Sequence, residues 1–217
     1  MCIRDSDHPG PTIATRVAGD ADIPVAVAAL AEAFASDPVL AFLCDDGPDP
    51  DPVRHQALVT ALFANRFLGG RGVDEIVVPD DPVDVREAAA VWVPPQRAND
   101  PGPDYTMSGV VNRLALGDEV MDERLTALMP MLSAAPHTPH WYLAFVGTRP
   151  PARGRGLASA LISAITRRCD EDGVGAYLES SDPANVPLYE RHGFVVTGEV
   201  AIEGGPTVPL MWRDPQR

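Results

Sequence analysis

Hydrophobic residues in the first third of the chain recur mostly at the spacing of an α-helix. A short strand is expected over residues 12–18, and the apolar positions that follow it predict a helix that stops at Asp37-Pro38. A second helix is expected over residues 53–68, because its apolar positions share one stripe and Gly69-Gly70 suits a helix end. Residues 45–52, which are only Asp, Gly and Pro, predict a loop between the two helices.

The middle of the chain changes to the shorter period of strands. Two apolar runs, 75–79 and 88–94, predict a pair of strands joined by an Asp/Pro turn. Residues 94–104 are again a Pro/Asp-rich loop, and residues 105–131 favour helix with a break near Gly117.

The last third shows the clearest alternation of strands and helices. Strands are expected over 140–147, 176–180, 194–200 and 207–212, and helices over about 155–172 and 185–192. Such interleaving predicts a single α/β (α+β) domain, here residues 12–217 without internal repeats. Residues 1–11 differ in character and are interpreted as a disordered or artefactual leader.

Composition and charge exclude several classes of partner and of catalytic site. The formal net charge of −14 argues against a nucleic-acid partner, since such proteins present a basic face to phosphate. The chain contains no lysine, which excludes a Schiff-base lysine and a P-loop. No apolar run is long enough to span a bilayer, and the amino terminus does not resemble an export signal, so we expect a cytoplasmic protein without a membrane partner.

One segment carries recognisable chemistry: Arg153-Gly154-Arg155-Gly156-Leu157-Ala158, which follows a predicted strand and begins a predicted helix. Glycines at a helix start allow backbone N–H groups to approach a ligand closely, and those unpaired amides favour an anion such as diphosphate. An ordinary turn would show the same glycines. A dinucleotide-binding fingerprint is a second alternative, with Glu179 as its ribose-binding acid, although Ser159 stands where its third glycine belongs.

The pattern Arg153-x-x-Gly156-x-Ala158 resembles the acyl-CoA motif of the GNAT superfamily of N-acetyltransferases. The resemblance continues through residues 177–181 and 185–194, and the run 140–200 is especially similar to puromycin N-acetyltransferase and its actinobacterial relatives. It implies a mixed, twisted central sheet of about seven strands, with helices on both faces. A V-shaped cleft is then expected between the fourth and fifth strands.

The same resemblance implies a set of site residues. Backbone groups of Phe145 and Val146 would pair with the pantetheine arm of acetyl-CoA, and Asn185 would contact the cofactor. The amides expected to hold the diphosphate are those of Arg153, Gly154, Arg155, Gly156, Leu157 and Ala158. No metal is expected, and the nearby histidines, His137 and His140, are interpreted as a loop pair.

Two residues are predicted to act in catalysis. Tyr189 matches the tyrosine that donates a proton to the departing sulfur in this family. Glu179 is a candidate general base, with Asp37 or a water molecule as the alternatives. The sequence leaves that choice open, because the strand expected to carry the thioester has no carboxylate over residues 143–146.

The leading hypothesis is therefore an N-acetyltransferase that moves an acetyl group from acetyl-CoA to a primary amine of a small molecule by direct attack. A non-catalytic acyl-CoA-binding domain and an NAD(P)-dependent reductase are the alternatives. Acceptor specificity is expected to come from residues 20–135, where the resemblance is loose.

Overall fold

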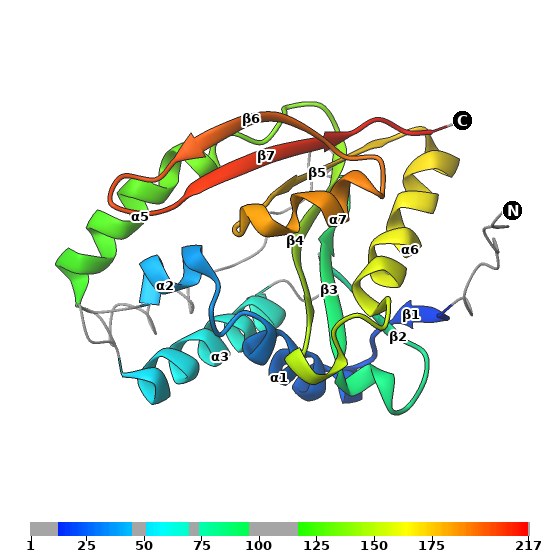
Figure 1. The fold of residues 1–217 in the computed structure, drawn as a ribbon, viewed down its shortest axis with the longest axis horizontal. Coiled ribbons are helices and arrows are strands. Elements are labelled where there is room, and N and C mark those ends of the chain that lie inside the picture. The colour runs from blue at the N-terminus through cyan, green and yellow to red at the C-terminus, as the bar shows by residue number, and fades with distance from the viewer. Residues whose placement is uncertain (1–12, 45–50, 70–73, 96–116, 217) are drawn as a thin grey trace, which may run out of the picture.

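The computed structural model describes residues 13–44, 51–69, 74–95 and 117–216, which form a single α/β domain (Figure 1). Within these residues the strands make one sheet in the order β1-β2-β3-β4-β5-β7-β6. The strands are β1 (Thr15–Val17), β2 (Glu75–Pro79), β3 (Ala88–Val93), β4 (His140–Thr148), β5 (Gly175–Glu179), β6 (Val195–Ala201) and β7 (Thr207–Arg213). Neighbouring strands are antiparallel, except that β4 and β5 are parallel.

Helices cover both faces of this sheet, as the sequence predicts. They are α1 (Ile23–Ala33), α2 (Pro38–Cys44), α3 (Pro52–Gly69), α5 (Asp118–Leu132), α6 (Leu157–Asp172) and α7 (Val186–Glu190). Short 3-10 turns are η1 (Asp20–Asp22), η2 (Asp84–Arg86), η3 (Pro150–Ala152) and η4 (Pro183–Asn185). In Figure 1, α1 and α3 lie together along the bottom of the view, and α6 lies on the right. None of the described helices is by itself long and apolar enough to cross a membrane. The segment 20–33 and α2 pass that test only as a pair bent by 96°.

The central strand β3 shows how the core is divided between the two faces. Every residue of β3 is buried. Ala89 and Val91 pack into the hydrophobic cluster formed with α1, α2 and α3. Ala88, Ala90 and Trp92 belong instead to the cluster formed with α6. The alternation of side chains along a strand therefore produces two separate hydrophobic layers, one on each side of the sheet.

A gap opens in the sheet where β4 and β5 separate. The two strands pair only over His140–Tyr142 and Gly175–Tyr177, after which β5 pairs with β7 alone on its other side. In Figure 1, β4 runs downward from this junction whereas β5 runs toward the left. Val91 faces Phe145 while Trp92 faces Leu143, so Ala144 is an extra residue in β4, a β-bulge at the point of separation. The predicted cleft between the fourth and fifth strands is present.

The sequence reasoning missed one helix. Asp37-Pro38 was expected to end the first helix, but α1 ends at Ala33 and Pro38 is the first residue of α2. The Asp37 Oδ1 atom accepts hydrogen bonds from the Val39 and Leu40 amides, at 3.0 and 2.9 Å. An Asp-Pro pair can thus be the N-cap and first turn of a new helix, and only the tertiary contacts of α2 select this outcome.

The sheet topology also overturns the dinucleotide-binding alternative. A Rossmann-type reductase needs a mostly parallel sheet, with the glycine-rich turn directly after a strand. Here only β4 and β5 are parallel, and η3 separates β4 from α6. The predicted leader, most of the loop 45–52 and the predicted helical residues 105–116 lie outside the described residues.

Candidate active site

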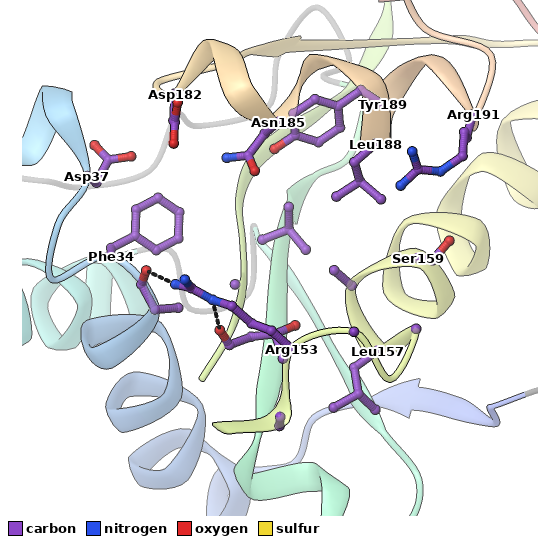
Figure 2. Close-up of a pocket in the computed structure, with 18 of the residues that line it drawn as sticks. Phe34, Asp37, Arg153, Leu157, Ser159, Asp182, Asn185, Leu188, Tyr189 and Arg191 are labelled. Atoms are coloured by element: carbon purple, nitrogen blue, oxygen red, sulfur yellow. Dashed lines mark hydrogen bonds between the residues drawn. The ribbon is translucent and has the colours of Figure 1, made fainter. Parts of the chain in front are cut away.

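A cavity of about 550 Å³ lies between the second half of β4, the start of α6, α7 and the α1–α2 connection. Figure 2 shows its walls, with Arg153 and Leu157 on one side and Asp37, Asn185 and Tyr189 on the other. It is lined by nine of the residues that the sequence singled out: Asp37, Val146, Arg153, Gly154, Gly156, Leu157, Ala158, Asn185 and Tyr189. Segments distant in the sequence therefore meet around one hollow.

The beginning of α6 presents open amides to this cavity. Gly156 is the N-cap, with φ +83°, and no side chain caps the helix. Ala160 donates the first bond of the helix, to the Gly156 carbonyl at 3.0 Å, and the Arg153 amide is occupied by the Pro150 carbonyl at 3.3 Å. Between them, the amides of residues 154–159 have no hydrogen-bond partner within the described chain. Such a run of amides, together with the helix dipole, is a binding site for an anion.

The arginine side chains around this helix start have different partners. The Arg153 guanidinium reaches across the cavity to the carbonyls of Ala33 and Thr148, at 3.2 and 3.4 Å, as the dashed lines in Figure 2 show. Arg155 does not line the cavity, because its side chain is paired with Asp84 of η2 at 2.6 Å. The prediction concerned the Arg155 amide, which has no hydrogen-bond partner within the described chain. Arg191, at the end of α7, lines the cavity instead, and no motif in the sequence marked it.

The two β4 residues predicted to hold the pantetheine arm differ in their side chains. Val146 lines the cavity, whereas the Phe145 ring lies in the core, against Phe63 and Phe34 at centroid distances of 4.9 and 5.8 Å. The prediction concerned their backbone groups. Beyond Tyr142 the edge of β4 has no strand partner on the β5 side among the described residues. Alternate peptide groups of β4 face that edge and are available to a ligand.

Tyr189 stands above the cavity with its hydroxyl available as a donor. The residue is 8% exposed and packs edge-on against Phe194. Burial raises the pKa of the Tyr189 phenol above its usual value, and the carboxylates of Asp37 and Asp182 raise it further. The phenol therefore keeps its proton at neutral pH, which suits a hydrogen-bond donor or general acid and excludes a general base.

Asp37 lies at the acidic end of the cavity but is already hydrogen-bonded. Its Oδ1 atom caps α2, and the Ser181 hydroxyl donates to Oδ2. Burial raises the pKa of the Asp37 carboxyl, the three hydrogen bonds oppose that shift, and Asp182 adds to it. This side chain joins the α1–α2 connection to the segment after β5. In Figure 2, Asp37 and Asp182 lie near each other, at the end opposite Leu157.

Glu179, one of the candidates for the general base, does not line the cavity. The side chains of β5 alternate, so Leu178 packs toward α6 while Glu179 lies on the other face, near Tyr142 and Tyr177. Burial raises the pKa of the Glu179 carboxyl, and the two phenols oppose the shift. The sequence placed Glu179 at the correct end of the strand but could not show which side of the cleft it faces.

His137, which precedes β4, and His140, its first residue, have no metal-site arrangement in the described part of the chain. His137 is exposed, and the His140 Nδ1 atom lies 2.7 Å from the Thr138 carbonyl. Across the described ranges, no group of three or more His, Cys, Asp or Glu side chains could hold a metal ion.

Comparison with known proteins agrees with this geometry. The family model of the acetyltransferase (GNAT) family matches residues 120–194, which include β4, α6, β5 and α7. An uncharacterised N-acetyltransferase of Schizosaccharomyces pombe is 28% identical over 210 residues, covering 90% of this chain and 81% of the relative.

Solved structures extend the likeness over nearly the whole chain. A structure from Corynebacterium glutamicum, described as histone acetyltransferase HPA2 and related acetyltransferase, superposes with a TM-score of 0.70 at 27% identity and covers 95% of this chain and 98% of its own. Arylalkylamine N-acetyltransferase 2 of Aedes aegypti shares the fold with a TM-score of 0.59 at 11% identity, covering 94% and 99% of the two chains. With its divided β4–β5 pair and open helix start, the chain has the GNAT fold and resembles the GNAT family of acetyltransferases.

Proposed function

We propose that the protein transfers an acetyl group from acetyl-CoA to a primary amine of a small molecule by direct attack. The observation that carries this proposal is the run of open amides over residues 154–159, which faces the same cavity as the unpaired edge of β4. A diphosphate and a peptide-like arm, attached to each other, are the two chemical features that these surfaces fit.

The residues present fit such a donor. The amides between Gly154 and Ser159 would hold the diphosphate, with Arg191 adding positive charge near it. The β4 edge around Val146 would pair with the amides of the pantetheine arm. Asn185, exposed at the end of η4, lines the cavity between this edge and α7. The donor itself supplies the activated thioester.

Tyr189 is proposed as the general acid. Its proton is held firmly because burial and two nearby carboxylates raise its pKa. Transfer to a departing thiolate becomes favourable when the same buried setting also raises the basicity of the sulfur. The chain thereby stabilises the leaving group and places the two reactants together, which are the main contributions that this reaction needs.

A cationic amine is the proposed acceptor. Asp37 and Asp182 make one end of the cavity negative, and the formal charge of −14 favours the approach of cations. A water molecule is proposed to remove the proton of the ammonium group, because the oxygens of Asp37 are already occupied by hydrogen bonds. Aminonucleosides are included among the acceptors because residues 140–200 resemble puromycin N-acetyltransferase.

Two measurements test this function. Isothermal titration calorimetry should show binding of acetyl-CoA, and a thiol-release assay should show turnover with at least one member of an amine panel. The panel contains polyamines, arylalkylamines, an aminonucleoside and a lysine peptide. The function is wrong if acetyl-CoA does not bind to freshly folded protein.

A non-catalytic acyl-CoA-binding domain remains the second candidate. It is favoured by one observation, namely that Glu179, one of the candidates for the general base, does not line the cavity. Tight binding of acetyl-CoA without thiol release from any amine in the panel would select this candidate.

A further inference from the structure

A histidine outside the cavity wall is hydrogen-bonded to a serine within it. His192 follows α7, and its ring lies beside two hydroxyl groups of α6. The His192 Nε2 atom lies 2.7 Å from the Ser159 Oγ atom, and the Nδ1 atom lies 3.4 Å from that of Ser163. Ser159 lines the cavity in the first turn of α6, where the amides are open. The imidazole is thus one hydrogen bond away from the proposed diphosphate site.

The main chain of His192 is fixed by its neighbours. The Arg213 Nε atom donates to the His192 carbonyl at 2.7 Å, and the same guanidinium binds both carboxylate oxygens of Asp170 at 2.7 and 2.8 Å. Arg213 is only 3% exposed. The next residue, Gly193, has φ +86°, and a Cβ atom there would lie 2.3 Å from the Gln216 side chain. The position of the ring is therefore imposed by packing between β7, α6 and the α7–β6 turn.

The surroundings of the ring keep it neutral in the free protein. Partial burial lowers the pKa of His192 below its usual value, and the positive charges of Arg191 and Arg213 lower it further. From α6 the ring meets the neutral hydroxyls of Ser159 and Ser163, and the Asp170 carboxylate on that helix is bound to Arg213. No carboxylate within the described residues contacts the ring to offset these two cations.

The position of the imidazole proton decides what Ser159 can do. When Nε2 carries the proton, it donates to the Ser159 Oγ atom, and the hydroxyl hydrogen is free to point into the cavity. When Nε2 lacks the proton, Ser159 donates to it and offers no hydrogen to a ligand. An anion beside the α6 amides favours the first arrangement. Its negative charge also favours a proton on both ring nitrogens.

We propose that Ser159 and His192 form a proton-linked phosphate subsite, in which Ser159 donates to a diphosphate oxygen and His192 takes up a proton from solvent as the diphosphate binds. Ser159 touches the ligand, whereas His192 acts through Ser159 as a positioning residue. This inference rests on the proposed function, since it assigns the diphosphate of the acyl donor to the cavity.

Dephospho-coenzyme A is the suitable probe. Coenzyme A carries a phosphomonoester whose second pKa, about 6, would add its own pH dependence. Dephospho-coenzyme A lacks that group but keeps the diphosphate. Its dissociation constant should fall as the pH is lowered from about 8 to about 5.5, by up to about tenfold for each unit by which binding raises the histidine pKa. Calorimetry in buffers of different ionisation enthalpy should show net proton uptake.

Two variants separate proton linkage from mere packing. In His192→Gln, the side-chain amide can still donate to Ser159 but cannot titrate, so we expect binding at a wild-type level near pH 8 without tightening at lower pH. In Ser159→Ala, binding should be several-fold weaker near pH 6, and proton uptake should be lost.

Matched controls are available in the chain. His137→Gln removes an exposed histidine far from this chain of hydrogen bonds, and Ser163→Ala removes the hydroxyl on the other ring nitrogen. Both should keep the pH dependence, and circular dichroism at each pH verifies that every variant is folded.

The outcomes distinguish the two proposals. If neither acetyl-CoA nor dephospho-coenzyme A binds, the proposed function fails. If both bind but wild-type affinity for dephospho-coenzyme A is the same at both pH values and no proton is taken up, only the subsite is refuted. An equal pH dependence in wild type and His192→Gln would refute it as well.

Discussion

The two ends of the cavity differ in their polar groups, which are main-chain amides at one end and side chains at the other. At the α6 end, the anion-binding groups are main-chain amides of one contiguous segment, 154–159. At the other end, the polar groups are side chains from three separate segments: Asp37 before α2, Asp182 after β5, and Tyr189 on α7. Chemistry at the first end should therefore depend on backbone shape, and chemistry at the second on the identity of individual side chains. The following substitutions test that contrast.

The largest effect is expected at Tyr189. Tyr189→Phe removes the phenolic proton but keeps the ring packed against Phe194, so kcat should fall by about 10²-fold with an acetyl-accepting amine. Affinity for acetyl-CoA should not change. Tyr142→Phe is the control, because Tyr142 is a half-buried tyrosine that does not line the cavity. Equal losses of kcat in both variants, measured by thiol release, would remove Tyr189 from the mechanism.

A smaller effect on binding is expected from Gly156→Val. This residue has φ +83°, where a β-branched side chain is strained by about 1–3 kcal/mol, so the helix start and its amides should shift. We expect acetyl-CoA to bind about tenfold more weakly. Gly173→Val places similar strain at the other end of the same helix, with φ +67° and open space around it. Calorimetry should show weakened binding only for Gly156→Val, and an equal loss in both would mean that general destabilisation is responsible.

A few-fold effect on the binding of acetyl-CoA is expected when arginines near the cavity are replaced. Arg191→Gln removes a charge that lines the cavity, whereas Arg155→Gln removes one that is already paired with Asp84. Exposed charges contribute about 0.2–1 kcal/mol, so Arg191→Gln should weaken binding of acetyl-CoA by up to about fivefold and Arg155→Gln by less than about twofold. The difference should shrink as salt is raised. A larger loss for Arg155→Gln would place the diphosphate nearer η2.

The smallest effect is expected at Glu179 and concerns stability. Because its pKa is raised in the folded state, the folded protein holds this proton more tightly than the unfolded chain. That contribution to stability is fully present below the unfolded pKa and is lost as the pH rises through the folded pKa. Glu179→Gln, which carries no charge, should therefore raise Tm at pH 7 by about 2–4 °C, or about 1 kcal/mol. The gain should vanish near about pH 4, and a thermal melt at several pH values measures it.

An opposite sign in this experiment would be informative. If Glu179→Gln lowers Tm at pH 7 and abolishes turnover, the carboxylate has a role at the cleft that its position outside the cavity does not suggest. Unchanged turnover is expected from the structure.

Sequence patterns predicted the elements of the second half of the chain closely. The strand and helix over 140–172 were recognised because their apolar periods are long and unmixed, and β4 and α6 follow them within about two residues. The helix α2 was missed, because Asp37-Pro38 was interpreted as the end of a helix, whereas α1 already ends at Ala33 and these two residues begin α2. Local chemistry alone cannot distinguish a stop from a restart.

For three residues, the sequence did not reveal where the side chain lies relative to the cavity. The amide of Arg155 was predicted to contact the ligand, but the sequence did not indicate that the Arg155 side chain pairs with Asp84, 71 residues away. Glu179 was one of the candidates for the base, and only the structure shows that alternation along β5 puts its side chain on the face opposite Leu178. Arg191 was not noticed, since a single arginine at a helix end has no distinctive pattern, and only the cavity reveals its position.

The sequence alone determined the open turn at the start of α6, because its glycines at positive φ and the uncapped helix start involve neighbours only a few residues apart. Tertiary structure decided the rest of the site. Asp37 meets Ser181 across 144 residues, and Ser159 meets His192 across 33, through the packing of whole helices and strands. Contacts over such separations depend on how two hydrophobic layers close around a sheet, and no local pattern encodes the distance between their surfaces.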